Sequence, residues 1–131
     1  MCIRDRIGYV FAEKPGYSKF GSYVGNASND GQFVYTGFKP SWVMLKQASG
    51  SADDWGIYDT TRQPDNEMDT LIRPDTDAVE YDGGSGRALD ILSNGFKLRT
   101  SNATFNEGET YIYMAFGQSL VGSNNVPCTA R

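Results

Sequence analysis

The sequence predicts an all-β domain, an antiparallel two-sheet β-sandwich that is jelly-roll-like. Three observations favour this fold class. Gly, Asn and Asp recur in short turn-like clusters, aromatic residues make up 13% of the chain, and no segment shows a helical period of apolar residues. Short apolar runs also follow one another at the intervals of strands joined by tight turns. The chain of 131 residues is long enough for one domain with one core.

Apolar runs and turn signals divide the first half of the chain into strands. Residues 17–24 alternate with a period of two, which is typical of a half-buried strand. Residues 41–47 are apolar on both sides, which predicts a strand in the middle of a covered sheet, and residues 55–59 can pair with it in a hairpin. Residues 7–13 and 32–35 complete the strands predicted in this half.

The second half contains the strongest local signal of the chain. Asn94-Gly95 lies between the apolar runs 89–92 and 96–100, and this dipeptide accepts the positive φ values of a two-residue hairpin turn. Residues 110–116 are apolar on both faces and predict a further buried strand.

Residues 60–86 have the weakest pattern. A structureless loop of about 25 residues is unusual, so we expect short edge strands at 68–73 and 78–81. The residues expected to form one core are Phe33, Val43, Leu45, Ile57, Leu92, Phe96, Leu98, Ile112 and Met114.

The chain is predicted to have four parts. Residues 1–6, MCIRDR, resemble translated sequencing-adapter read-through of the kind found in metagenomic assemblies. Residues 7–15 are interpreted as the remnant strand of an upstream domain, residues 16–120 as the β-sandwich, and residues 121–131 as a C-terminal tail. The remnant strand is expected to be detached or to pair as a foreign edge strand.

The charge distribution excludes some partners. The formal net charge is −4 and the pI is about 4.7, whereas nucleic-acid binding requires a basic face. No run approaches the roughly 20 apolar residues that span a bilayer, so no membrane partner is predicted. The acidity is concentrated in residues 53–90, which hold eleven acidic residues against three arginines. One strongly acidic face or edge is therefore expected.

The residue types argue against an enzyme. The chain has no histidine, which removes the commonest general base and the Ser-His-Asp and Cys-His triads. A glycosidase-like carboxylate pair needs only two acids on a cleft, but no spacing selects one. The acids that leave this alternative open are Asp53, Asp54, Asp59, Glu80 and Asp82.

No cofactor or metal site is predicted. Phosphate-binding glycine motifs are missing, and Cys2 and Cys128 lack neighbouring ligands with metal spacing. Asp75-Thr76-Asp77 and Asp82-Gly83 are rich in oxygen, as calcium loops are, but the EF-hand pattern is absent. We interpret them as solvated acidic loops, and calcium binding stays an open alternative.

A ligand site is hypothesised at Trp55, Tyr58, Asp59 and Arg62. An aromatic strand enters a polar loop there, which places a stacking surface beside hydrogen-bonding groups. Such a pairing suits a cell-surface glycan. The alternative is that Trp55 and Tyr58 fill the core while the charges keep the loops solvated.

Four runs carry a resemblance to a known family. They are GYSKFGSY at 16–23, FVYTGFKPSWV at 33–43, LSNGFKLR at 92–99 and YIYMAF at 111–116. In this order they resemble an uncharacterised C-terminal β-domain of structural and tail-associated proteins of marine bacteriophages. That family usually closes with an acidic residue and Pro after the Ala-Phe pair, where this chain has Gly-Gln-Ser. Residues 11–15, FAEKP, resemble the usual ending, and this supports the remnant interpretation.

The resemblance implies a non-enzymatic structural domain of a virion protein, such as a tail-fibre or receptor-facing module located in the phage particle. Its implied partners are other virion proteins or further copies of the chain, and a cell-surface glycan. The alternative function is a carbohydrate-binding module of a secreted bacterial protein, which would share the fold and the exposed aromatic residues.

Overall fold

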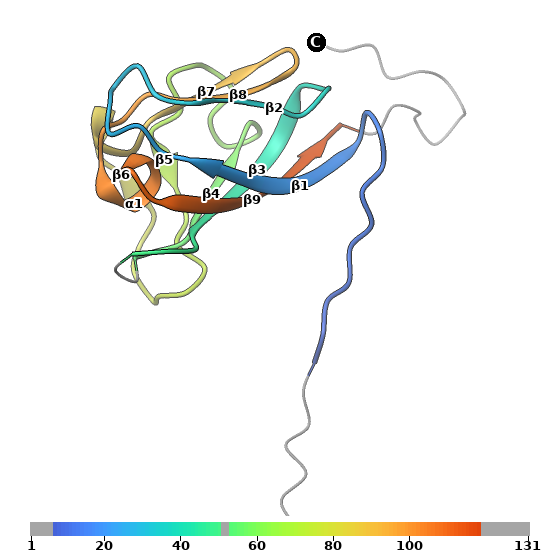
Figure 1. The fold of residues 1–131 in the computed structure, drawn as a ribbon, viewed down its shortest axis with the longest axis horizontal. Coiled ribbons are helices and arrows are strands. Elements are labelled where there is room, and N and C mark those ends of the chain that lie inside the picture. Colours follow the sequence, from blue (N-terminus) through green and yellow to red (C-terminus); the bar gives the residue numbers. More distant parts are fainter. Residues whose placement is uncertain (1–6, 51–52, 119–131) are drawn as a thin grey trace, which may run out of the picture.

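The computed structural model describes residues 7–50 and 53–118 of the chain. The fold is predominantly β, as predicted, and its sheets are antiparallel (Figure 1). The strands are β1 (Ser18–Val24), β2 (Phe33–Tyr35), β3 (Pro40–Gln47), β4 (Gly56–Asp59), β5 (Thr70–Leu71), β6 (Tyr81–Asp82), β7 (Leu89–Leu92), β8 (Gly95–Leu98) and β9 (Thr110–Gly117). Two single-turn helices accompany them, the 3₁₀ helix η1 (Gly84–Arg87) and α1 (Ala103–Asn106). Neither is long enough to cross a membrane, and no other helix occurs in the described ranges.

The strands form two main sheets and one small one. The first sheet has four strands in the order β1-β9-β3-β4, and the second has three in the order β2-β8-β7. The third is the short pair β5-β6. In the first sheet β9 lies between β1 and β3, with Met114 opposite Phe20 on one side and opposite Met44 on the other. The strand nearest the C-terminus thus joins two strands from the first third of the chain.

The two main sheets share one core. Phe96 of β8 is fully buried, and its ring packs edge-on against Tyr23 of β1 and Tyr113 of β9, with centroids 6.4 Å and 5.5 Å away. Val43 and Leu45 of β3 belong to the same buried cluster. Burying an aromatic or branched side chain contributes roughly 1.5–3 kcal/mol relative to leaving it exposed, so this cluster is a main source of stability.

The expected core was partly correct. Val43, Leu45, Phe96 and Leu98 are fully buried as predicted, and Ile57, Leu92 and Met114 are half-buried. Two predictions were wrong, because Phe33 is 39% exposed and Ile112 is 46% exposed. Ile112 points to the side of β9 that faces away from the second sheet. Phe33 lies on an edge strand, where the adjacent residue Val34 points inward instead.

Several predicted strands agree with the structure. The hairpin between β7 and β8 forms, but Leu92 pairs with Gly95, so the two turn residues are Ser93 and Asn94. The positive φ values expected at Asn94-Gly95 are not found. The weak central region contains β5 within the predicted strand 68–73, whereas β6 overlaps the predicted strand 78–81 only at Tyr81. The helix α1 was not predicted. It begins after Asn102, whose side chain accepts a hydrogen bond from Thr104 N at 2.9 Å. Four residues are too few to give a helical period, so only this capping residue could have indicated it.

The prediction of a strand at residues 7–13 was wrong, because these residues form no strand and lie outside the sheets. The first bridge in the described chain joins Lys14 to Ser18, across the turn that leads into β1. Within the described ranges no strand pairs with residues 7–13, and the N-terminal part of this segment runs away from the domain (Figure 1). The C-terminal tail predicted at 121–131 lies outside the described residues.

Asn106 fastens the end of α1 to the loop between β1 and β2. Its buried Nδ2 donates to Asn26 Oδ1 at 2.9 Å, to Ser28 O at 2.8 Å and to Thr100 O at 2.7 Å. Its Oδ1 accepts from Asn26 N at 3.1 Å. Gly25 begins the loop, and a Cβ there would lie 1.9 Å from the carbonyl oxygen of Glu107. The loop is therefore held by one buried amide and by a close backbone approach.

We predict that Asn106→Ala destabilises the domain by about 2–4 kcal/mol, because it leaves buried backbone groups without partners. The matched control is Asn102→Ala, which removes only a cap and should cost about 1 kcal/mol. Chemical denaturation of both variants measures the difference. Equal costs would contradict the role assigned to Asn106.

Candidate functional site

The face of the four-stranded sheet that points away from the second sheet carries rows of large side chains. The strand registers define three rows. We call this surface the outer face, and its rows are Ser18, Phe116, Trp42 and Asp59; then Phe20, Met114, Met44 and Ile57; then Ser22, Ile112 and Lys46. Residues directly opposite one another on neighbouring strands are in contact distance, so each row is continuous.

Phe116 is the centre of an aromatic cluster at one end of the outer face. Its ring centroid lies 5.5 Å from that of Trp42, 5.7 Å from Phe20, 5.8 Å from Phe11 and 6.2 Å from Tyr17. Edge-to-face pairs of this kind contribute roughly 0.5–1.5 kcal/mol each beyond burial. The cluster holds the chain segment before β1 against the sheet.

The remainder of the outer face mixes apolar side chains with Ser22, Lys46 and Asp59, and several of its apolar residues are exposed. Val24, Ile112 and the neighbouring Ile72 are 59%, 46% and 41% exposed. Large exposed apolar patches are rare on monomeric proteins and commonly mark contact surfaces.

The structure does not bring the four hypothesised ligand residues together. Tyr58 is buried in the core, and its hydroxyl donates to the carbonyl oxygen of Arg87 at 2.5 Å, so the prediction that it contacts a ligand was wrong. Trp55 is half-buried, with Lys46 Nζ 5.4 Å from its ring centroid. Asp59 and Arg62 are also half-buried, with Oδ2 and Nε 3.9 Å apart.

The alternation along β4 explains this result. Gly56 and Tyr58 point to the core, whereas Ile57 and Asp59 point to the outer face. Trp55 lies just before β4, and by the same alternation its side chain is on the side of Ile57 and Asp59. The period of two already separates Trp55 from Tyr58, and applying it strictly would have removed Tyr58 from the hypothesised site.

The three arginines of the acidic region pair with three of its eleven acidic residues. Asp54 Oδ2 lies 3.0 Å from Arg73 Nη1 and 3.4 Å from Arg87 Nη1. The third arginine of the region, Arg62, pairs with Glu80 as well as with Asp59. Asp54, Asp59 and Glu80 are therefore each paired with a cation. In residues 7–50 and 53–118, no three His, Cys, Asp or Glu side chains gather where they could share a metal ion.

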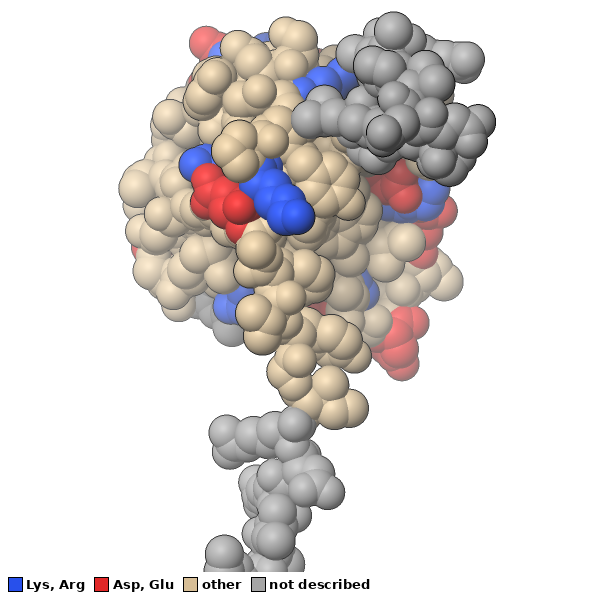
Figure 2. All heavy atoms as spheres, turned by 90° about the vertical axis from the view of Figure 1, so that its right-hand side faces the viewer, with Lys and Arg blue, Asp and Glu red and all other residues tan. Residues whose placement is uncertain are grey.

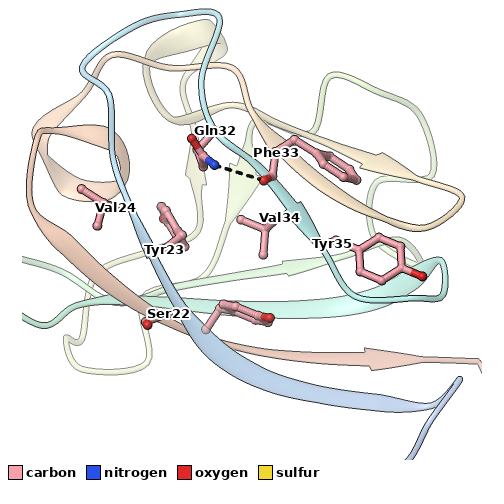
Figure 3. Close-up of a pocket in the computed structure, with 8 residues that line it drawn as sticks. Ser22, Tyr23, Val24, Gln32, Phe33, Val34 and Tyr35 are labelled. Atoms are coloured by element: carbon pink, nitrogen blue, oxygen red, sulfur yellow. Dashed lines mark hydrogen bonds between the residues drawn. The ribbon is translucent and has the colours of Figure 1, made fainter.

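A groove of about 530 Å³ lies between β1 and β2. Figure 3 shows Tyr23 and Val34 pointing toward each other across it from the two strands. None of its lining residues is charged: Ser22, Tyr23, Val24, Gln32, Phe33, Val34, Tyr35 and Tyr113. The sequence analysis missed this groove, because β1 and β2 belong to different sheets. The sequence of neither strand indicates that the other lies beside it.

Comparison with known families identifies the shared unit. Residues 2–119 match a family described as Domain of unknown function (DUF7483). The chain belongs to this family. The DUF7483 match spans every strand described above and also residues 7–13. Neither the curated proteins nor the solved structures contain a significant match.

The buried tyrosines of this DUF7483 domain are expected to make its stability sensitive to alkaline pH. Burial raises the pKa of Tyr58 and of Tyr23 above the usual value near 10. A group whose pKa is raised in the folded state stabilises fully below its unfolded pKa, and this contribution is lost as pH rises above it.

We predict that the free energy of unfolding falls above about pH 10, with a slope of up to about 1.4 kcal/mol per pH unit for each buried tyrosine. Tyr58→Phe should reduce this slope, although it also loses the hydrogen bond to Arg87 O. Tyr35→Phe is the control, because Tyr35 is 64% exposed. Urea titrations at several pH values measure both. An unchanged slope in Tyr58→Phe would contradict the assignment.

Proposed function

We propose that this chain is a non-enzymatic structural domain of a bacteriophage virion protein, a tail-fibre or receptor-facing module of the phage particle. Its two main sheets are proposed to be arranged as a jelly-roll-like β-sandwich, around the core that Phe96 shares with Tyr23 and Tyr113. The domain acts by contact with other virion proteins or with further copies of itself.

The observation that carries this proposal is where the phage-like runs lie in the fold. Residues 16–23 and 111–116 contain the paired strands β1 and β9, residues 33–43 contain β2 and the start of β3, and residues 92–99 contain the turn and strand of the β7-β8 hairpin. The resemblance therefore lies in the framework of the two sheets. The acidic region at 53–90 lies mostly outside these runs. A likeness concentrated in the framework suits a structural role.

The surface chemistry supports the same proposal. The outer face and the groove between β1 and β2 are largely apolar or uncharged, as contact surfaces in assemblies are. The carboxylates Asp54, Asp59 and Glu80, candidates for a glycosidase pair, are each engaged by arginine.

Mass spectrometry of density-purified phage particles that carry the gene tests the proposal. We expect peptides of this chain at a copy number in fixed proportion to the other structural proteins, and portal, capsid or tail genes beside its gene. Particles without these peptides, from a genome in which the gene lies among glycoside hydrolase modules, would support the secreted carbohydrate-binding alternative.

A glycan contact is a second candidate, because Trp55 stays half-exposed beside Lys46, and Asp59 lies on the same face. Trp55→Ala is expected to weaken binding to host-cell polysaccharide by about tenfold or more, since stacking on the indole is lost. Trp42→Ala is the matched control on the same face. Glycan-array or calorimetric binding measures both. Unchanged binding in a folded Trp55→Ala variant would exclude this site.

A further inference from the structure

The groove between β1 and β2 is bordered by two open strand edges. In β1, Tyr17 O accepts from Gly117 N at 2.7 Å and Gly25 N donates to Glu109 O at 3.0 Å, so the odd-numbered residues bond to β9. The backbone groups of the alternate residues Ser22 and Val24 therefore point away from β9. Within the described ranges, no strand pairs with this edge.

The edge of β2 is open in the same way. Gln32 O accepts from Leu98 N at 3.1 Å and Thr36 N donates to Asn94 O at 3.0 Å, so the even-numbered residues bond to β8. The N–H groups of Phe33 and Tyr35 consequently point outward. The Phe33 carbonyl has only a long contact of 3.5 Å, from the side chain of Gln32. Figure 3 shows both edges beside the groove.

The chain itself carries a segment with the properties of a missing strand. Ile7, Tyr9 and Val10 are 84%, 82% and 96% exposed, an unusual state for apolar residues. The run from Ile7 to Val10 is uncharged, like the groove lining. It also lies within the region matched by the family. Figure 2 shows the segment projecting from the body of the domain.

The segment is held away from the groove of its own copy. Phe11 packs on Phe20 and Phe116 of the outer face, and the Ala12 carbonyl accepts a hydrogen bond from Ser18 Oγ at 2.8 Å. From this anchor the chain runs outward (Figure 1). Entry into its own groove would break these contacts, whereas a neighbouring molecule can receive the segment without such a loss.

We propose that residues 7–10 of one copy insert as an added strand into the groove between β1 and β2 of a second copy. Alternate side chains of a strand point to opposite sides, so Ile7 and Tyr9 together face Tyr23 and Val34, while Gly8 and Val10 face outward. The four residues are close in length to β2, which has three residues, and are shorter than β1, which has seven. The added strand satisfies the free backbone groups of an edge and covers exposed apolar surface on both copies. The open strand edges and the exposed segment support this insertion, and they do so whether or not the chain belongs to a virion.

Self-association of the full chain tests the proposal. Sedimentation velocity over a range of concentrations should show a concentration-dependent oligomer, and Tyr9→Asp should weaken the association by about tenfold or more, because it places a charge in an uncharged groove. The matched control is Val79→Asp, at a residue that is 85% exposed and outside the groove. It should leave the association unchanged.

Cross-linking identifies which copy supplies the strand. In a background with Cys2→Ser and Cys128→Ser, one variant carries Val10→Cys and the other Tyr35→Cys, and their mixture is treated with a short bismaleimide. The proposal predicts a covalent heterodimer, and Val79→Cys in place of Val10→Cys should give none. A chain that is monomeric at all concentrations overturns the proposal. So does association that Tyr9→Asp does not weaken, or cross-linking that occurs only within a single chain carrying both cysteines.

Discussion

The insertion of β9 between β1 and β3 is the constraint on which the rest of the structure depends. β1 and β3 do not pair with each other, and each finds its long antiparallel partner in residues 110–117. The four-stranded sheet therefore cannot form until β9, about 90 residues beyond β1, pairs with it. Closing so long a loop costs chain entropy, which extensive burial of apolar surface must offset. Tyr111 and Ala115 of β9 are fully buried, and Tyr113 packs on Phe96 of the second sheet. One strand thus completes a sheet and supplies much of the core.

The same arrangement determines which surfaces are available for contact. With β9 in the middle, β1 becomes an edge, and the order of the second sheet makes β2 an edge beside it. Among the described residues, the outer face is covered at one end, where Phe11 and Tyr17 pack on Phe116. Two adjacent strand edges that are open within the described ranges, together with a partly covered apolar face, suit contact with other molecules. This is the physical basis of the proposed structural role.

The sequence predicted the all-β class with antiparallel sheets, the β7-β8 hairpin and most strands, because turn residues and the period of two are local signals. The sequence did not predict which face of a strand is buried where burial depends on what packs against that face. Ile112 and Tyr113 are both apolar, and only the position of the second sheet decides that Tyr113 is buried and Ile112 is not. Tyr58 was placed in a ligand site because its neighbours are polar, although its phase along β4 directs it inward.

The short helix and the groove were unpredictable for a related reason. α1 is stabilised through tertiary hydrogen bonds of Asn106 to residues in another loop, which propensity over four residues does not report. The groove combines residues of β1, β2 and β9, and each contributes an unremarkable polar or apolar side chain. Features built from distant segments leave no local pattern.

Native-state hydrogen exchange of the dilute monomer tests the central role of β9 most directly. Both edges of β9 are paired, so its amides from Tyr111 to Phe116 should exchange only through global unfolding. Along β1 only alternate amides bond to β9. The amides of Ser22 and Val24 should therefore exchange far faster than those of Gly21 and Tyr23. Exchange of the β9 amides at lower free energy than those of the β7-β8 hairpin, or uniform protection along β1, would contradict this account.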